Sequence, residues 1–127
     1  MSLQKITLRT YREGNIMIKM LTLAKYSPEA LKGMVDNPMS RSDAVSKVFD
    51  GAGVKIHSID FCMGDWDVVL IAEAETMDQY TAVILTIVSS GAIEDWKTYP
   101  LISDKEFTEG MKTANKLATG SAYKKPN

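Results

Sequence analysis

Cysteine and histidine are nearly absent from this sequence of 127 residues, which contains one of each. A single cysteine cannot form a disulfide within the chain, and a structural zinc site usually takes four Cys or His ligands at short spacings. The composition therefore argues against a disulfide-rich secreted scaffold and against a metal centre. We expect neither a metal ion nor a cofactor.

An excess of charge and a long apolar run are also lacking. The 15 Lys and Arg residues balance 16 Asp and Glu residues, so the chain has no overall basic character of the kind with which proteins bind nucleic acid. No apolar stretch approaches the ~18 to 20 residues of a membrane span, and none has the flanks of a secretory leader. We expect a cytoplasmic protein whose partners include neither nucleic acid nor a membrane.

Motifs that accompany common chemistries are missing as well. The sequence contains no G-x-G-x-x-G, P-loop, H-E-x-x-H, EF-hand loop or G-x-S-x-G. Nucleotide binding, zinc-dependent proteolysis, calcium binding and serine hydrolysis therefore have no support. The sequence predicts an architecture, but it does not predict a definite activity.

The strongest local signal is a β-hairpin over residues 54–74, VKIHSIDFCMGDWDVVLIAEA. β-Branched and aromatic residues fill both arms, and Gly64 with Asp65 and Asp67 supplies the turn chemistry between them. If Asp65 and Trp66 form the loop, Gly64 pairs with Asp67, and each cross-strand pair places its side chains on one face. One face is then apolar and should meet helices: Ile59, Phe61, Met63, Val68, Leu70 and Ala72. The other face is mixed: Ser58, Asp60, Cys62, Val69, Ile71 and Glu73.

The mixed face cannot be an ordinary dry core, because burying an unpaired carboxylate costs several kcal/mol at the least. Three interpretations are open: a wet surface, the wall of a pocket, or a contact between subunits.

Other elements follow from periodicity and capping residues. We expect a central strand over residues 16–24, a short helix that begins at Ser27-Pro28, and a helix over about 42–50 capped by Ser40 or Ser42. A helix over about 76–90 should open with a Thr76–Gln79 capping box. The segment 92–102 should form an edge strand or one that leaves the sheet, and a last helix should follow, capped by Ser103. The helix over 42–50 should turn Ala44, Val45, Val48, Phe49 and Ala52 inward, and the last helix should do the same with Phe107, Met111, Ala114 and Leu117.

The resulting order, βαββαβ followed by a helix, predicts an α+β fold of the ferredoxin-like kind. In this fold both crossover helices lie on one side of an antiparallel four-stranded sheet. We place the domain at residues 15–119, between an N-terminal extension (1–14) and a flexible tail (120–127). The uncovered sheet face keeps apolar residues, so we expect a second copy of the chain to bury it in a homodimer or a higher homo-oligomer.

The turn Gly64-Asp65-Trp66-Asp67, followed by VVLIAEA, resembles the GYD domain family, in which this turn usually carries tyrosine in place of Trp66. The segments SPEALKGMVDNPMSRSDAVSKVFDGAG and SGAIEDWKTYPLIS extend the likeness, which covers about residues 16–114. The resemblance implies a domain of the dimeric α/β barrel kind. It implies no particular activity, and function does not transfer between barrels that share only a fold.

Candidate site residues come from the mixed face and its surroundings. Histidine is the usual general base at neutral pH, so His57 could act as a base, but we favour a structural role on the apolar side of the hairpin, opposite about Ala74. Asp60 and Glu73 should lie about a diagonal step apart, either as an acid–base pair or as partners of Lys19 or of a second subunit's lysine. We expect Cys62 to be a semi-buried thiol and Arg41 to be exposed, with an anion contact as the alternative.

Three hypotheses about function remain open. The first is a homodimer that binds a small, partly apolar molecule on the open sheet face, with Lys19, Ser58, Cys62, Trp66, Glu73 and Trp96 as ligand-binding residues. The second is a cofactor-independent oxygenase or an isomerase-type enzyme with His57 or Asp60 as the general base. The third is a domain that serves assembly alone.

Overall fold

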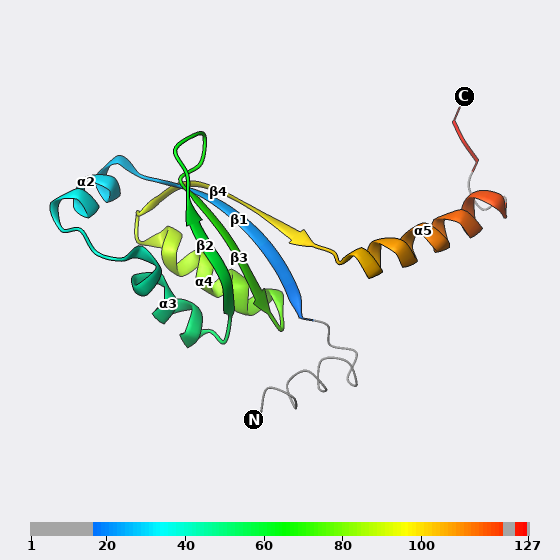
Figure 1. The fold of residues 1–127 in the computed structure, drawn as a ribbon, viewed down its shortest axis with the longest axis horizontal. Helices are drawn as coiled ribbons and strands as arrows, with labels where there is room; N and C mark the ends of the chain where they lie inside the picture. Colours follow the sequence, from blue (N-terminus) through cyan, green and yellow to red (C-terminus); the bar gives the residue numbers. More distant parts are fainter. Residues whose placement is uncertain (1–16, 121–123, 127) are drawn as a thin grey trace.

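The computed structural model describes residues 17–120 and 124–126, and within these ranges it contains one four-stranded sheet and four helices. The predicted extension (1–14) lies outside the described residues, as do residues 121–123 and 127 of the predicted tail. In chain order the elements are β1 (Ile18–Tyr26), α2 (Pro28–Asp36), α3 (Arg41–Gly51), β2 (Lys55–Phe61), β3 (Val68–Ala74), α4 (Met77–Ser89), β4 (Ile93–Leu101) and α5 (Asp104–Thr119) (Figure 1).

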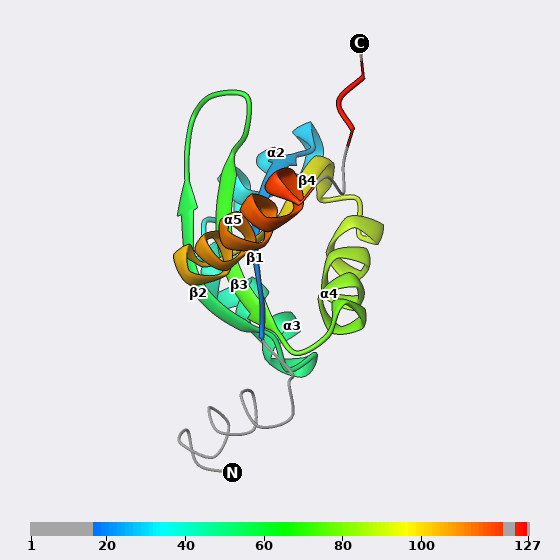
Figure 2. The ribbon, with the colours of Figure 1, turned by 90° about the vertical axis from the view of Figure 1, so that its right-hand side faces the viewer.

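The sheet has the strand order β2-β3-β1-β4, and all three strand pairs are antiparallel. Helices α3 and α4 cover one face of it (Figures 1 and 2). This is the ferredoxin-like arrangement that the sequence predicted, with β4 at a sheet edge as expected. We call the helix-bearing side the covered face and the other side the open face.

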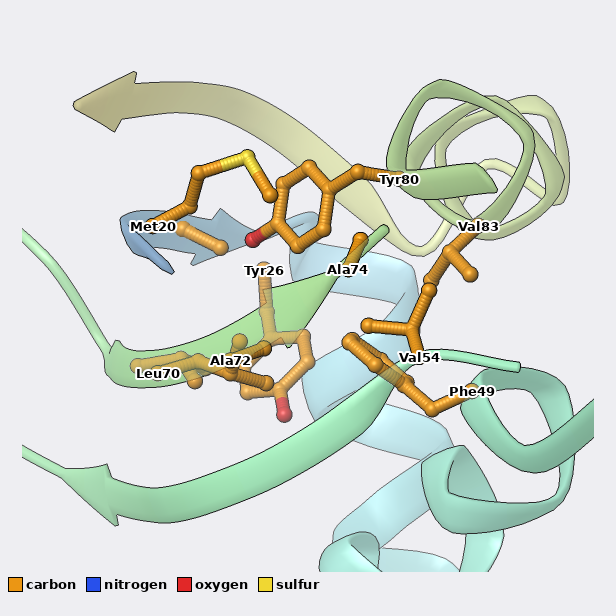
Figure 3. Close-up of a cluster of buried hydrophobic side chains, with 11 residues drawn as sticks. Met20, Tyr26, Phe49, Val54, Leu70, Ala72, Ala74, Tyr80 and Val83 are labelled. Atoms are coloured by element: carbon orange, nitrogen blue, oxygen red, sulfur yellow. The ribbon is translucent and has the colours of Figure 1, made fainter. Parts of the chain in front are cut away.

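Burial alternates along the two central strands. In β1 the even-numbered residues from Met20 to Tyr26 are buried, and in β3 Val68, Leu70, Ala72 and Ala74 are buried. These side chains meet Phe49 and Val54 from the α3 side and Tyr80 and Val83 from α4 (Figure 3). The rings of Phe49 and Tyr80 contact edge to face, with their centroids 6.5 Å apart, so the two helices share one apolar core.

Capping residues set the helix boundaries as predicted. Ser27 caps α2, Ser40 caps α3, and Thr76 forms the capping box with Gln79 at the start of α4. Gly53 and Gly91 follow α3 and α4 with φ values of 76° and 84°, a backbone conformation that strains other residues. The predicted inward stripe of α3 is wrong at Ala44, which is exposed.

The hairpin differs from the prediction in its register. Cys62 N–H donates to the Asp67 carbonyl at 2.9 Å, and Phe61 lies opposite Val68, so the loop is longer than the predicted pair Asp65-Trp66. The register is displaced by two residues, and the two faces survive because side chains alternate with a period of two. Met63 falls in the loop and is fully exposed, however, and Phe61 is 53% exposed beyond the helices.

Helix α5 is the largest departure from the predicted packing. It extends beyond the end of β4 and away from the sheet (Figures 1 and 2). Its apolar residues Phe107, Met111 and Leu117 are each more than half exposed, not buried as expected. Amphipathic periodicity identified the helix correctly, but periodicity does not say which molecule supplies the surface that covers the apolar stripe.

Candidate functional site

The open face carries most of the residues singled out in the sequence. Its centre is a strip of half-buried aliphatic side chains, and charged residues surround it. The aliphatic residues on β1 and β3 are Leu21, Leu23, Val69 and Ile71. Lys19, Ser58, Asp60 and Glu73 share this face, as predicted. Tyr99 and Leu101 of β4 extend the apolar strip, because they lie opposite Leu21 and Lys19.

His57 lies on the open face, which corrects the prediction that it joins the apolar side. A β-bulge between Ile56 and Ser58 inserts His57 as an extra residue, and its Nε2 lies 2.8 Å from Oε1 of Glu73. A bulge re-aims side chains without leaving a signature in the hydrophobic pattern, so periodicity could not predict it.

Asp60 and Glu73 do not form the predicted carboxylate pair. Asp60 lies opposite Val69, four residues from Glu73 along β3, which corresponds to about 13 Å. Glu73 pairs with His57 instead, and Lys19 lies opposite Glu73 in the neighbouring strand. The two carboxylates are therefore too far apart to share a proton.

The two tryptophans lie on different faces. Trp66 is half-buried in the hairpin loop, and Nζ of Lys97 sits 5.7 Å from its ring centroid. Lys97 lies opposite Leu23 on the open face. Trp96 lies opposite Ala24 on the covered face, so it does not share a surface with Trp66 as predicted.

Asp67 fastens the hairpin loop to the end of β1. Its Oδ2 accepts from Tyr26 N–H at 2.9 Å, and its own N–H donates to the Ala24 carbonyl at 2.9 Å. The Asp67 carboxylate therefore binds one backbone N–H, which belongs to β1 and not to the turn. The Cys62 thiol donates to the Trp66 carbonyl, and it is exposed, which corrects the prediction that it is semi-buried.

A small apolar cavity lies on the covered face, between the sheet and helices α3 and α4. Its volume is about 70 Å³. Thr22, Phe49 and Tyr80 form part of its inner wall, and Tyr26, Arg41 and Trp96 also line it. Of the residues predicted to form a site, only Trp96 and the alternative anion contact Arg41 belong to this cavity.

Arg41 combines a charge with an unsatisfied donor at this cavity. Its Nε is buried and has no hydrogen-bond partner among the described residues. Burial raises the pKa of the neighbouring Tyr26 hydroxyl, and the nearby Asp67 carboxylate acts in the same direction. The Arg41 guanidinium opposes both effects through hydrogen bonding and through its charge. The Tyr26 hydroxyl is therefore neutral at physiological pH and can donate a hydrogen bond.

A second group of hydroxyls is satisfied internally. The Tyr80 hydroxyl bonds to Oγ1 of Thr22, which also lies 2.9 Å from Oγ1 of Thr98. Burial raises the pKa of Tyr80, whereas its hydrogen bonds to the two threonines lower it. These groups already have partners, so the unsatisfied polar atom of the cavity is on Arg41.

Arg41 and Tyr26 were not predicted as a pair. A single arginine after a serine cap has no pattern that distinguishes a buried guanidinium from an exposed one. The available clue was Tyr26 at the end of an apolar strand, on the parity of the core residues Met20 and Ala24.

Neither a metal-binding cluster nor a membrane-spanning helix is found among the described residues. In the part of the chain that the structure describes, no three His, Cys, Asp or Glu side chains are grouped so that they could hold a metal ion. Across those same residues, no helix has both the length and the apolar character needed to cross a bilayer.

Solved structures with a similar fold include a transcriptional regulator from Neisseria meningitidis. The chain superposes on the crystal structure of MtbAldR with a TM-score of 0.52 at 11% identity, covering 80% of this chain and 66% of that one. It superposes on the transcriptional regulator NMB0573 from Neisseria meningitidis, solved as an L-Met complex, with a TM-score of 0.51 at 14% identity and the same coverages. The chain thus spans slightly less than two thirds of each, and identities this low show the fold alone.

Among proteins with curated descriptions, none matches this sequence. The sequence profile of the GYD domain, in contrast, matches residues 20–111, a range that runs from β1 to the middle of α5. It includes the hairpin turn fastened by Asp67 and both helices that enclose the cavity. This chain belongs to the GYD domain family.

Proposed function

We propose that this GYD domain is a homodimeric binding protein for a small, partly apolar molecule. The observation that carries the proposal is that the two faces of the sheet differ in what they could bind. The open face has an apolar strip suited to a subunit contact, and the covered face has an apolar cavity with polar groups at Arg41 and Tyr26. The ligand position differs from the open-face position that the sequence suggested.

The dimer proposal rests on two apolar surfaces without a partner in the single chain. One is the strip on the open face, with Leu21, Leu23 and Ile71 at its centre. The other is the exposed stripe of α5. A two-fold arrangement that opposes the open faces of two copies, with α5 of each against the other, would bury both surfaces and would form a dimeric α/β barrel.

The ligand proposal rests on the chemistry of the cavity. Small-molecule sites are concave and mostly apolar, with a few polar groups that fix orientation. The cavity has this composition, although its volume of about 70 Å³ limits it to a small occupant. NMB0573, which shares the fold, is described as a complex with L-Met. We place the binding protein in the cytoplasm, in keeping with its composition.

The native mass of the full-length chain purified from cells tests both parts together. We expect a dimer that carries a reproducible additional mass of a small molecule. A bare monomer would contradict the dimer. A bare dimer that binds none of the small carboxylates and amides described below would leave assembly as its only function.

A pair of substitutions tests the interface. Ile71→Glu places a charge in the open-face strip and should convert the dimer to a monomer in sedimentation velocity, because desolvating an unpaired carboxylate is costly. Val35→Glu is the matched control, since Val35 is 76% exposed on α2 and should leave the mass unchanged. A dimer that persists in Ile71→Glu would show that the open face is not the interface.

The His57–Glu73 contact supports a second candidate, an oxygenase- or isomerase-type enzyme. Its imidazole and carboxylate are partly exposed, at 32% and 26%, and the carboxylate can orient the ring as a general base. In this hypothesis His57 is the base and Glu73 orients it, Asp60 has no part in the chemistry, and a second subunit closes the pocket. Turnover would then be lost in a folded His57→Ala variant and retained in Asp60→Asn.

A further inference from the structure

We propose that the covered-face cavity binds a short-chain monocarboxylate, whose carboxylate group is held by the Arg41 guanidinium and the Tyr26 hydroxyl. The inference rests on the proposed ligand-binding function and deepens it by naming the class of ligand.

The first support is the unsatisfied donor. Nε of Arg41 is buried, and no described residue accepts its hydrogen bond. A buried polar group without a partner costs free energy, and such groups are rare in native proteins. No ion pair within the described ranges neutralises Arg41 either. A ligand carboxylate would supply both the acceptor and the negative charge.

The second support is the match between donors and ligand. Arginine presents its N–H groups in a planar fork that fits the two oxygens of a carboxylate. Tyr26 adds a neutral O–H donor beside it, because its phenol pKa lies above the ordinary value of 10.0. The Arg41 cation lies beside this neutral hydroxyl and near the Asp67 carboxylate, so a monoanion suits the site better than a phosphate dianion. The first turn of α3, where Arg41 lies, also favours negative charge.

The third support is the position of Arg41 between two hollows. Arg41 and Ala92 line both the apolar cavity and a more open hollow of about 240 Å³ beside α2, which Met34 and Met39 also line. A ligand can therefore place its carboxylate at Arg41 and its hydrocarbon against Phe49 and Tyr80. An engineered apolar cavity of about 150 Å³ accepts benzene, so a cavity of about half that volume restricts the tail to a few carbons.

The test uses a matched pair of probes, 3-methylbutanoate and 3-methylbutanamide, which share a shape and differ in charge. The chain has two tryptophans, so a full-length Trp66→Phe protein leaves Trp96, at the cavity, as the only indole reporter. Titration of its fluorescence gives the affinity of each probe. We expect the carboxylate to bind at least about tenfold more tightly than the amide, because charge-assisted hydrogen bonds are the stronger kind.

Three substitutions locate the effect. Arg41→Gln should abolish the preference for the carboxylate, and Arg41→Lys should retain part of it, because lysine keeps the charge and loses the fork. Tyr26→Phe should weaken carboxylate binding several-fold. Lys47→Gln removes an exposed charge from the same helix outside the cavity and should leave the preference intact. Circular dichroism of each variant establishes that it is folded.

The outcomes separate this inference from the proposed function. Equal affinity for acid and amide would overturn the carboxylate assignment and leave a ligand-binding cavity in place. A carboxylate preference that survives in folded Arg41→Gln would overturn the role of Arg41. If no acid or amide of about four to eight carbons binds, both the inference and the ligand-binding part of the proposed function fail.

Discussion

At the scale of single residues, hydroxyl groups inside the core distinguish this domain from a purely apolar sandwich. Tyr80 is 2% exposed, and its hydroxyl reaches Thr22 on the central strand, which in turn reaches Thr98 on the edge strand. Three elements are thereby joined by side-chain hydrogen bonds. Thr22 lies at a core position of β1, where burying its hydroxyl would cost free energy without the partners Tyr80 and Thr98.

The raised pKa values of Tyr80 and Tyr26, caused chiefly by burial, predict an alkaline loss of stability. Above about pH 10 the unfolded chain releases phenolic protons that the folded chain retains, so the unfolding free energy falls as pH rises. Tyr80→Phe should lower that free energy by about 1 kcal/mol near pH 7, where a hydrogen bond is lost. It should also make the alkaline decline shallower.

Urea unfolding from about pH 7 to 11 measures both effects. Val35→Ala is the control, because Val35 is 76% exposed on α2 and carries no ionisable group, so it should change stability by less than about 0.5 kcal/mol and leave the alkaline slope unaltered. An identical slope in Tyr80→Phe and the unsubstituted protein would refute the assignment to Tyr80.

Sequence reasoning reached some residues and missed others for physical reasons. Strand alternation placed Lys19, Ser58 and Glu73 on one face, because the period of two survives an error of two in register. It misplaced His57, since a bulge adds a residue without changing composition. It placed Trp96 on the wrong face, because the parity of an edge strand depends on pairing that no local pattern specifies.

At the scale of elements, two helices begin with the same chemistry and differ in what they pack against. Thr76 with Gln79 opens α4, and Ser103 with Glu106 opens α5, each as a reciprocal capping box. Helix α4 contributes Tyr80 and Val83 to the core, whereas α5 has no buried residue. The sequence predicted where both helices begin, because capping involves residues close together in the chain. It could not predict what α5 packs against, because packing depends on residues distant in the chain or in another molecule.

The contrast predicts different consequences for equivalent substitutions. Thr76→Ala should lower the unfolding free energy by about 1 kcal/mol at every protein concentration, since α4 belongs to the core of each chain. Ser103→Ala should act through the proposed dimer, so its effect on the thermal midpoint should depend on protein concentration. Thermal melts over a hundredfold range of concentration measure the difference. Two variants with the same concentration dependence would argue against a contact between α5 and a second copy.

At the scale of the whole molecule, the order of elements was predictable and the surfaces between molecules were not. Periodicity and turn residues are enough to yield βαββαβ, and handedness rules then leave few topologies. The cavity escaped prediction because it forms between the sheet and helices α3 and α4, and its lining residues are far apart in sequence. The open face is covered only if a second molecule binds it. The sequence indicates such a molecule only through the apolar residues that the domain's own helices do not cover.

Acidic substitutions in α5 test that account. Phe107→Asp with Met111→Asp should shift the dimer to a monomer while leaving the fold of each domain intact, because neither side chain is buried in the single chain. Sedimentation velocity gives the mass, and near-ultraviolet circular dichroism reports the packing of the core aromatics. Lys105→Gln with Lys112→Gln lowers the net charge of α5 by the same two units at lysine positions and is the control for charge. Loss of core packing in the Phe107 and Met111 variant would instead place α5 against its own domain.

The hydrogen bonds of Asp67 affect how mutagenesis of the family's turn should be interpreted. The Asp67 carboxylate accepts the Tyr26 N–H, and Tyr26 also lines the cavity. A substitution in the turn can therefore displace Tyr26 and alter the cavity without any contact between the turn and a ligand. A turn variant that loses binding would then mimic the loss of a contact residue. Asp67→Asn alters the group that binds the Tyr26 N–H, whereas Trp66→Phe leaves that carboxylate in place. Comparing the two variants therefore distinguishes an indirect effect on the cavity wall from the loss of a direct contact between the turn and the ligand.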